Sequence, residues 1–555
     1  MVLKERRLSE WPAIANGLIN AMTEVDKVEI GREEEEITIE KTTKCKNIKT
    51  YLKEYCENSS IQGLNYVVAD GISILERIWW VLVLGGCIGG CIYMITEIYI
   101  KWAESPVLVS LATRDTPITE IPFPAITVCP EAKLKETCFN YTKVLEAVQS
   151  GKNVTENEHL GFDYMSLLCK ADNHKITPDK PDTFDQKFYE FLYECRSVEL
   201  NMSYCKWMDR PMDCRKLFKP LMTDEGICYS FNSFDIKDIH TDIVPRNYFD
   251  EADKMVTWDP DDGYPKTVNN SVKEYPRRAL LAGAVNSLTA VFFTKADDIL
   301  YNCRDFVYQG LKVSLHMPSR IPRPSQVYFN VGLDRITSGV VLPTLMSTAK
   351  SVESTPPEVR NCYFSRERKL AYYKIYSQNN CNMECTTNYT KAVCGCVAYY
   401  MPRDAQTPIC GPKKMKCLER SLSALTKPRT EIEKKAAAEK AKCFCVPICV
   451  DLSYNVEISS GPFEKPDQLN TGKTLAELEG YHASAVKVYF KNPFFLPNQR
   501  NELYGPTDFI SNFGGILGLF TGFSLFSIAE LFYFATIRLV ENRRKYGHWG
   551  GPKKD

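Results

Sequence analysis

The sequence predicts a two-span α-helical membrane protein with a large, disulfide-rich α+β domain between the spans. Three observations predict it: two long uncharged apolar segments, 18 cysteines between them, and five N-x-S/T sequons among those cysteines. The 555 residues include 69 basic and 69 acidic ones, so no charge excess indicates a nucleic-acid partner. A mean hydropathy of −0.27 is too polar for a protein of many spans. One or two spans and a large aqueous part are therefore expected.

Residues 1–77 are predicted to be a polar cytosolic segment, and its charge run GREEEEITIEK indicates a solvated stretch. The first span is predicted at 78–100. It contains 19 uncharged residues, Ile78–Thr96, close to the roughly 20 that cross a bilayer core as a helix. Its start deep in the chain argues against a signal peptide. A buried helix of a soluble protein is the alternative, but such a helix normally keeps a polar face.

Residues 101–508 are predicted to be extracellular, because an even set of cysteines indicates disulfide pairing in an oxidising compartment. The other four of the 22 cysteines precede or lie within the first span, and none follows the second. Sequons in this region point to the same side of the membrane. They predict glycosylation at Asn140, Asn153, Asn201, Asn269 and Asn388.

Within this region, strands are predicted for AITV within FPAITVC (123–129), for VYFNVGL (327–333) and for SAVKVYF (484–490), and an Ala/Glu/Lys run predicts a helix at 430–442. Ten cysteines between 362 and 449 form two sets of five with matching spacings. Two antiparallel segments joined by disulfides, like the rungs of a ladder, would produce this pattern. A zinc site is the alternative, but the region contains no histidine.

The second span is predicted at 509–537 and a cytosolic tail at 538–555. Phe509–Ala529 has no charge, and Arg538, Arg543, Arg544 and Lys545 follow the span, as the positive-inside rule expects of a cytosolic end. Both termini are therefore predicted to be cytosolic. The stretch GLFTGFSLFSIAE (518–530) is unusual for a span, because it combines glycines, hydroxyls and a glutamate. Packing between helices is an alternative role for its glycines.

These motifs resemble those of the epithelial sodium channel/degenerin family, over about residues 55–545. The resemblance rests on FPAITVC (123–129), GICYSFN (226–232), CFCVPIC (443–449), the ten-cysteine pattern and SNFGGILGLFTGFSLFSIAELF (511–532). Phrases such as IPFPAITVCPE and CGCVAYYMPR look closest to the insect pickpocket branch. The resemblance implies an amiloride-sensitive, sodium-selective plasma-membrane channel, with Na⁺ as the permeant ion and no cofactor. It also implies a palm, thumb and finger ectodomain and a homo- or hetero-trimer of related subunits.

The resemblance also implies roles for individual residues. The selectivity filter falls on Gly522, Phe523 and Ser524. The pore and gating positions fall on Ser511, Asn512, Gly518, Glu530 and the pair Gln62–Gly63. The three copies of Glu530 are expected to form a cation-attracting ring on the cytosolic side.

The implied disulfides are Cys129–Cys228, Cys205–Cys214, Cys362–Cys449, Cys381–Cys445, Cys385–Cys443, Cys394–Cys417 and Cys396–Cys410. Four cysteines, at 138, 169, 195 and 303, keep three alternative pairings.

Two residues depart from the family pattern. Gln62 replaces the histidine of the cytosolic His-Gly motif, which raises the alternative of an accessory or non-conducting, receptor-like subunit that needs a related partner. Phe523 is bulkier than the usual middle filter residue, and we expect it to pack away from the pore.

An enzyme is not expected, because none of the six histidines pairs with a nucleophile in a local motif. An ATP-gated channel is another alternative, but it would need a ten-cysteine ectodomain, whereas the region 101–508 contains 18 cysteines. Gating is expected to act through the extracellular domain, by a chemical, osmotic or mechanical stimulus, and an extracellular ligand is one candidate partner.

Overall fold

The computed structural model describes residues 48–104, 107–169, 181–198, 200, 203–245, 255–265, 274–303, 308–426, 443–464 and 478–549. The chain divides into two compact units, one formed by Met1–Glu104 with Tyr504–Asp555 and one by Ser105–Leu503. Asn201, Asn269, the charge run before residue 48 and the helix expected at 430–442 lie outside the described residues.

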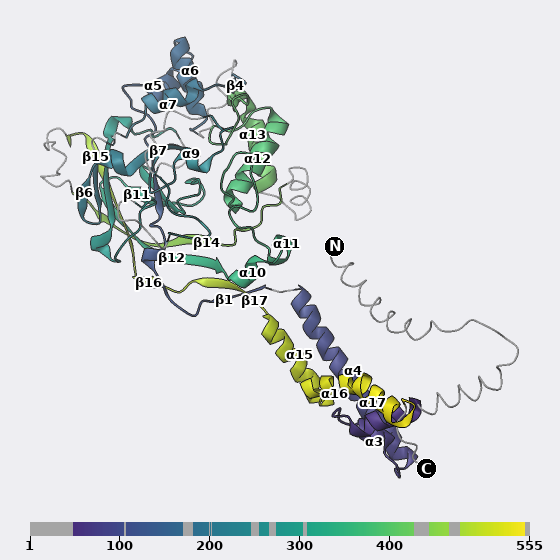
Figure 1. Ribbon diagram of the computed structural model, residues 1–555. Coiled ribbons are helices and arrows are strands. Elements are labelled where there is room, and N and C mark those ends of the chain that lie inside the picture. The colour runs from purple at the N-terminus through teal and green to yellow at the C-terminus, as the bar shows by residue number, and fades with distance from the viewer. Residues whose placement is uncertain are drawn as a thin grey trace. The chain divides into compact units, whose positions relative to one another are not determined.

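The first unit is helical (Figure 1). Helical residues 48–58 precede α3 (Leu64–Val68), α4 (Ile74–Glu104), α15 (Pro506–Thr521), α16 (Leu525–Ala535) and α17 (Ile537–Tyr546). The predicted first span lies inside α4, which extends beyond it at both ends. Its 31 residues give a length of about 46 Å at 1.5 Å per residue. Among the described residues, α4 is the one continuous helix long and apolar enough to cross a membrane.

The second apolar segment is not the single helix that the sequence analysis predicted over 509–537. α15 ends at Thr521 and α16 begins at Leu525, and the two helical stretches are bent by 73° at the break. Gly522 follows α15 with φ +69°, the left-handed conformation in which glycine commonly ends a helix. Ser524 then starts α16, because the Ser527 hydroxyl accepts a hydrogen bond from its N–H at 3.0 Å. That this pair crosses a membrane as one bent span stays a prediction.

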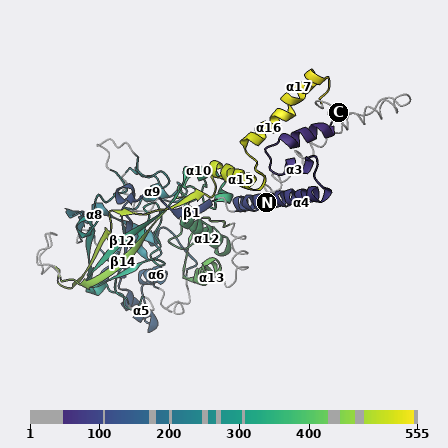
Figure 2. The same cartoon turned by 90° about the horizontal axis from the view of Figure 1, so that it is seen from below.

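The second unit is built on two large sheets (Figures 1 and 2). The eight-stranded sheet has the order β1-β17-β12-β15-β9-β5-β6, with β14 pairing with β12. Its strands are β1 (Val107–Leu111), β5 (Tyr204–Trp207), β6 (Arg210–Met212), β9 (Leu288–Lys295), β12 (Arg335–Thr348), β14 (Asp451–Pro462), β15 (Tyr481–Phe490) and β17 (Asn498–Glu502). β12 runs parallel to β15 and β17 and antiparallel to β14, with Val341 opposite both Val456 and Phe490.

The five-stranded sheet has the order β11-β10-β3-β8-β7. Its strands are β3 (Ala125–Pro130), β7 (Phe218–Thr223), β8 (Gly226–Phe231), β10 (Gly310–His316) and β11 (Phe329–Gly332). Two further pairs join β4 (Thr183–Phe184) to β13 (Ile409–Cys410) and β2 (Thr116–Pro117) to β16 (Phe494–Phe495). The FPAITVC motif thus supplies β3, which is buried along its whole length.

Helices of the second unit lie mainly at its margins. They are α5 (Tyr141–Gln149), α6 (Glu156–Ser166), α7 (Lys187–Glu194), α8 (Cys214–Leu217), α9 (Ile236–Ile239), α10 (Lys350–Glu353), α11 (Pro357–Arg360), α12 (Gln378–Cys394) and α13 (Met415–Thr426). Short 3-10 turns occur at Ile118–Glu120, Ala284–Asn286, Ala296–Asp298 and Pro412–Lys414. Figure 1 shows α5, α6 and α7 gathered at one end and α12 beside α13.

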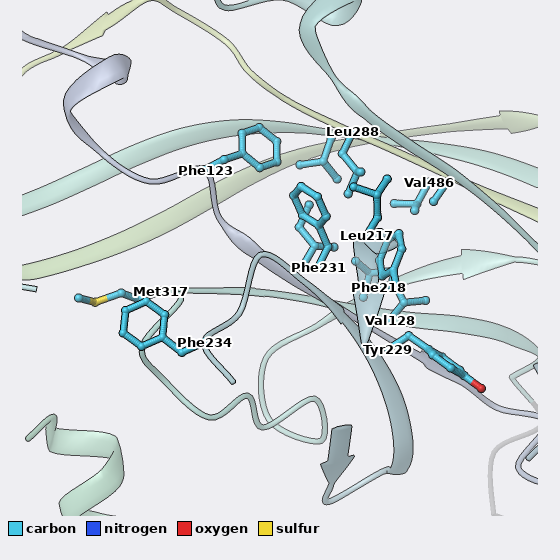
Figure 3. Close-up of a cluster of buried hydrophobic side chains, with 14 of the residues drawn as sticks. Phe123, Val128, Leu217, Phe218, Tyr229, Phe231, Phe234, Leu288, Met317 and Val486 are labelled. Carbon is cyan, nitrogen blue, oxygen red and sulfur yellow. The ribbon is translucent and has the colours of Figure 1, made fainter. Parts of the chain in front are cut away.

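Aromatic side chains fill the core between the two sheets (Figure 3). Phe123 is fully buried, and its ring contacts those of Trp207 at 4.8 Å and Phe490 at 5.3 Å between centroids. Phe231 of the five-stranded sheet contacts Trp207 of the eight-stranded sheet, and Phe218 of the five-stranded sheet contacts Phe292 of the eight-stranded sheet. Edge-to-face contacts of this kind add to the stability that burial itself supplies. The two sheets therefore share one core.

The structure contains nine disulfides among its described cysteines. Seven are the pairs that the family resemblance implies, including the five of the ladder: Cys129–Cys228, Cys205–Cys214, Cys362–Cys449, Cys381–Cys445, Cys385–Cys443, Cys394–Cys417 and Cys396–Cys410. The four unassigned cysteines pair as Cys138–Cys195 and Cys169–Cys303. Three rungs fasten α12 and the segment before it to the residues that enter β14, and the other two join the end of α12 to α13 and to β13.

Three predicted glycosylation sites can be placed. Asn153 and Asn388 are exposed, the latter on α12. Asn140 caps α5: its side chain accepts a hydrogen bond from the Lys143 N–H at 2.9 Å and donates one to Glu136 at 2.7 Å. A glycan on Asn140 would replace one of that amide's hydrogens. Glycosylation at all three stays a prediction.

Candidate pore site

The predicted filter residues occupy the break between α15 and α16. The N–H of Gly522 donates to the Gly518 carbonyl at 2.9 Å, and that of Phe523 donates to the Leu517 carbonyl at 3.4 Å. These bonds close the last turn of α15. Ser524 is then extended, with φ −128° and ψ 177°. The filter backbone is therefore not helical. Residues of α15 and α16 consequently do not keep the angular spacing of one continuous helix.

A segment from the other end of the chain lies against this break. The N–H of Gln62 donates to the Thr521 carbonyl at 2.9 Å. A Cβ atom at Gly522 would lie 2.7 Å from Cγ of Gln62, closer than any real contact. Gly63 has φ +92° and precedes α3. The structure therefore joins two predicted sites, Gln62–Gly63 and the filter, that the sequence places at opposite ends of the chain.

Glu530 takes part in the same contact. Its carboxylate accepts a hydrogen bond from the Ser60 N–H at 2.9 Å, and the Ser60 and Ser527 hydroxyls lie 2.7 Å apart. Ser527 is 1% exposed and also accepts from the Ser524 N–H. Ser527 and Glu530 therefore hold residues 60–62, the residue-60 segment, against α16. A cation ring formed by Glu530 stays a prediction.

Arg538 pairs with Glu54. Its Nε lies 3.1 Å from the Glu54 carboxylate, and its Nη2 bonds to the same oxygen. The Tyr51 hydroxyl donates to the Phe534 carbonyl close by. The helical residues before 59 thus contact α16 and α17. Sequence reasoning missed these contacts, because no local pattern relates residues 51–60 to residues 521–538.

The remaining pore candidates lie along α15. Ser511 and Asn512 are exposed, and the Ser511 hydroxyl donates to the Thr507 carbonyl at 2.8 Å. Helix packing was the alternative role for Gly514 and Gly518. A Cβ atom would meet nothing within 4 Å at Gly514, and at Gly518 only the Phe523 carbonyl at 3.8 Å.

Gly90 of α4 allows close packing between α4 and α15. A Cβ atom at Gly90 would lie 2.9 Å from the Phe520 ring. The GGCIGG stretch of the first span was a signal for this contact.

Phe523 is half-buried, and its direction relative to a three-fold axis stays a prediction.

Residues 55–534 match the sequence model of the amiloride-sensitive sodium channel family. Pickpocket protein 28 of Drosophila melanogaster is 29% identical over 511 residues, which cover 88% of this chain and 79% of that protein. The sodium channel protein Nach of the same organism is 21% identical, over 88% and 87% of the two chains. Acid-sensing ion channel 1C of Danio rerio is 22% identical, over 87% and 82%.

Proposed function

Because the chain belongs to the amiloride-sensitive sodium channel family, we propose that it is a subunit of a trimeric, sodium-selective and amiloride-sensitive channel of the plasma membrane. The observation that supports this most directly is the non-helical Gly522–Ser524 segment between two apolar helices. A hydrated Na⁺ ion loses part of its shell in a filter, and carbonyl and hydroxyl oxygens replace it. The Gly-Phe-Ser segment between the two helices offers both kinds of oxygen.

We propose that α4 crosses the membrane once and that α15 and α16 together cross it a second time. The last turn of α17 carries Arg543, Arg544 and Lys545, which supports a cytosolic C-terminus. The pairing of Glu54 with Arg538, near the start of α17, supports the same side for the N-terminal segment. The unit between the spans holds all nine disulfides, which supports an oxidising, extracellular environment for it.

The residue-60 segment is proposed to support the filter from the cytosolic side. Its hydrogen bonds reach both ends of the break, at Thr521 through Gln62 and at Ser527 and Glu530 through Ser60. A rigid filter keeps its oxygens at the spacing that a partly dehydrated ion needs. Movement of this segment would release the filter, so gating signals can reach the pore from the cytosolic end of the chain.

The test is to record from cells that express this chain alone and together with a related subunit. We expect an inward current in external Na⁺ that amiloride blocks and that disappears when a large organic cation replaces Na⁺. Surface labelling provides the control for delivery to the plasma membrane. A current only on co-expression would favour the accessory-subunit alternative raised by Gln62. Labelled surface protein without current in either case would contradict the proposal.

A further inference from the structure

A cavity of about 790 Å³ lies in the second unit between β10, the loop that follows it, α12 and β14. This volume falls within the range of pockets that hold small organic ligands. Three ladder cysteines border it, and none of its other residues is a sequence-predicted site residue. The candidate pore does not account for it.

The floor of the cavity is apolar and fixed. Met317, Met383 and Leu452 line it and are 2%, 6% and 2% exposed. Met317 belongs to the main core, where it lies beside Phe234 (Figure 3). The Tyr454 hydroxyl donates to the Pro122 carbonyl at 2.9 Å, which leaves the ring as its contribution to the wall. Thioethers make favourable contacts with aromatic rings, so this floor favours an aromatic or aliphatic ligand body.

The wall presents unused amides. Gln326, Asn379 and Asn382 line the cavity and are exposed. Within the described part of the chain, no side-chain hydrogen bond engages these three amides. Each offers one carbonyl and two N–H donors. The cavity therefore has an apolar floor and a hydrogen-bonding wall.

Arg320 determines which ligand charge the cavity favours. Its Nη2 pairs with Asp451, but its buried Nε finds no hydrogen-bond partner among the described residues. A buried donor without an acceptor is costly, and a ligand oxygen would satisfy it. Arg323 also lines the cavity, and its Nε lies 3.3 Å from Asp224. No aspartate or glutamate is among the described lining residues, so nothing there attracts a cation. Because both guanidiniums already have a carboxylate partner, one further negative charge fits better than two.

We propose that this cavity binds a small organic monocarboxylate with an aromatic or aliphatic body. One carboxylate oxygen accepts from Arg320 Nε, the wall amides complete its hydrogen bonds, and the body lies on Met317 and Met383. A ligand there would contact α12, the strand β10 and the strand β14 at once. Its effect on current rests on the proposed channel function, whereas its binding does not.

The test is thermal unfolding of the purified full-length protein with 3-phenylpropionate, 3-phenylpropanamide or 3-phenylpropylamine. These three probes share one body and differ in the head group. We expect a saturable rise in the unfolding temperature with the carboxylate and at least roughly tenfold weaker effects with the amide and the amine. Equal responses to all three, or none to the carboxylate, would overturn the proposal.

Variants locate the site. Asn382→Asp or Asn379→Asp adds a negative charge to the wall and should weaken binding of 3-phenylpropionate roughly tenfold. Asn330→Asp is the matched control, because Asn330 is exposed on β11 and does not line the cavity. Binding that Asn382→Asp and Asn379→Asp leave unchanged, or that Asn330→Asp weakens equally, would place the ligand elsewhere. If the carboxylate binds but no current is ever recorded, the channel proposal fails and the site stands.

Discussion

Gly522 is the residue whose conformation the candidate filter depends on. Its positive φ and the nearby Gln62 side chain both exclude a Cβ atom. We predict that Gly522→Ala abolishes at least nine-tenths of the sodium current, measured at equal surface expression. Gly514→Ala is the control, since Gly514 is helical and a Cβ there meets nothing within 4 Å. Equal currents in the two variants would show that the break does not need glycine.

Two substitutions of Glu530 distinguish whether its carboxylate holds the residue-60 segment or forms a charged ring. Glutamine keeps an oxygen that accepts from the Ser60 N–H but removes the charge, whereas leucine removes both. Loss of a hydrogen bond to a charged group costs about 1.5–3 kcal/mol. We predict that Glu530→Gln retains sodium conductance within about twofold and that Glu530→Leu lowers current about tenfold or more. A large loss of unitary conductance in Glu530→Gln would instead support the ring.

His316 gives the second unit an acid-sensitive stability. Burial, and secondarily the charge of Arg320, lowers its pKa to about 4. Its Nε2 lies 2.8 Å from the Thr127 hydroxyl and its Nδ1 lies 3.0 Å from the Met317 carbonyl. The folded state therefore favours the neutral ring. Its contribution to stability is complete above the unfolded pKa of about 6.5 and is lost as pH falls from there towards 4.

We predict that this loss amounts to about 3 kcal/mol at pH 4. Thermal unfolding of the full-length protein between pH 7.5 and pH 4 measures it. His316→Gln should flatten the pH dependence, even if it lowers stability at pH 7.5. The same slope in wild type and variant would assign the effect to other groups, among them His240, whose pKa burial also lowers to about 4.

At the scale of elements, the disulfide ladder should behave as one nested structure. The Cys362–Cys449 rung closes 87 residues, and such a loop alone implies about 4.6 kcal/mol of stabilisation. While the neighbouring Cys381–Cys445 rung is intact, the Cys362–Cys449 rung closes a much shorter loop. Its stabilisation of the folded state is then expected to be about 3.5 kcal/mol. We predict the smaller loss of stability for the double variant Cys362→Ser with Cys449→Ser, measured by thermal unfolding. A loss of 4.6 kcal/mol or more would mean that the rungs act independently.

Elements with a strong local pattern could be predicted from the sequence. The strands expected at 123–129 and 484–490 are β3 and β15, because alternating or continuous apolar residues indicate a buried strand. β12 was missed, since Gly339 and Pro343 lie inside its 14 residues and both residue types are uncommon in strands. The bend at Gly522 left no signal in the apolar pattern of 509–537. A run of apolar residues reports hydrophobicity and not the direction of a helix axis.

For the whole molecule, three copies are needed before the candidate filter encloses an ion path. A single α15–α16 break contributes one set of oxygens, and an ion needs ligands on several sides. We predict that the purified full-length protein has a mass of three chains by light scattering corrected for detergent. A stable monomer with bound amiloride would contradict this. The number of chains could not be read from one sequence, because symmetric contacts leave no periodic signal in it.

Sites that join distant residues were also beyond sequence reasoning. The filter, the residue-60 segment and Glu530 were each singled out, but their hydrogen bonds depend on how α3, α4 and α16 pack. The cavity beside α12 had no motif at all, because amides and methionines are common on any surface. Local chemistry could be predicted here, whereas which residues meet could not.

The hydrogen bond between Ser60 and Glu530 can form only late in the synthesis of the chain. The two residues are 470 positions apart, so at about 5–20 residues per second a ribosome needs on the order of a minute to synthesise the second after the first. During that time the disulfides of the second unit can form while the segment around Ser60 still waits for its partner. A nascent chain therefore completes its filter last. A truncation anywhere before α16 should leave the residue-60 segment exposed as a signal of incomplete synthesis.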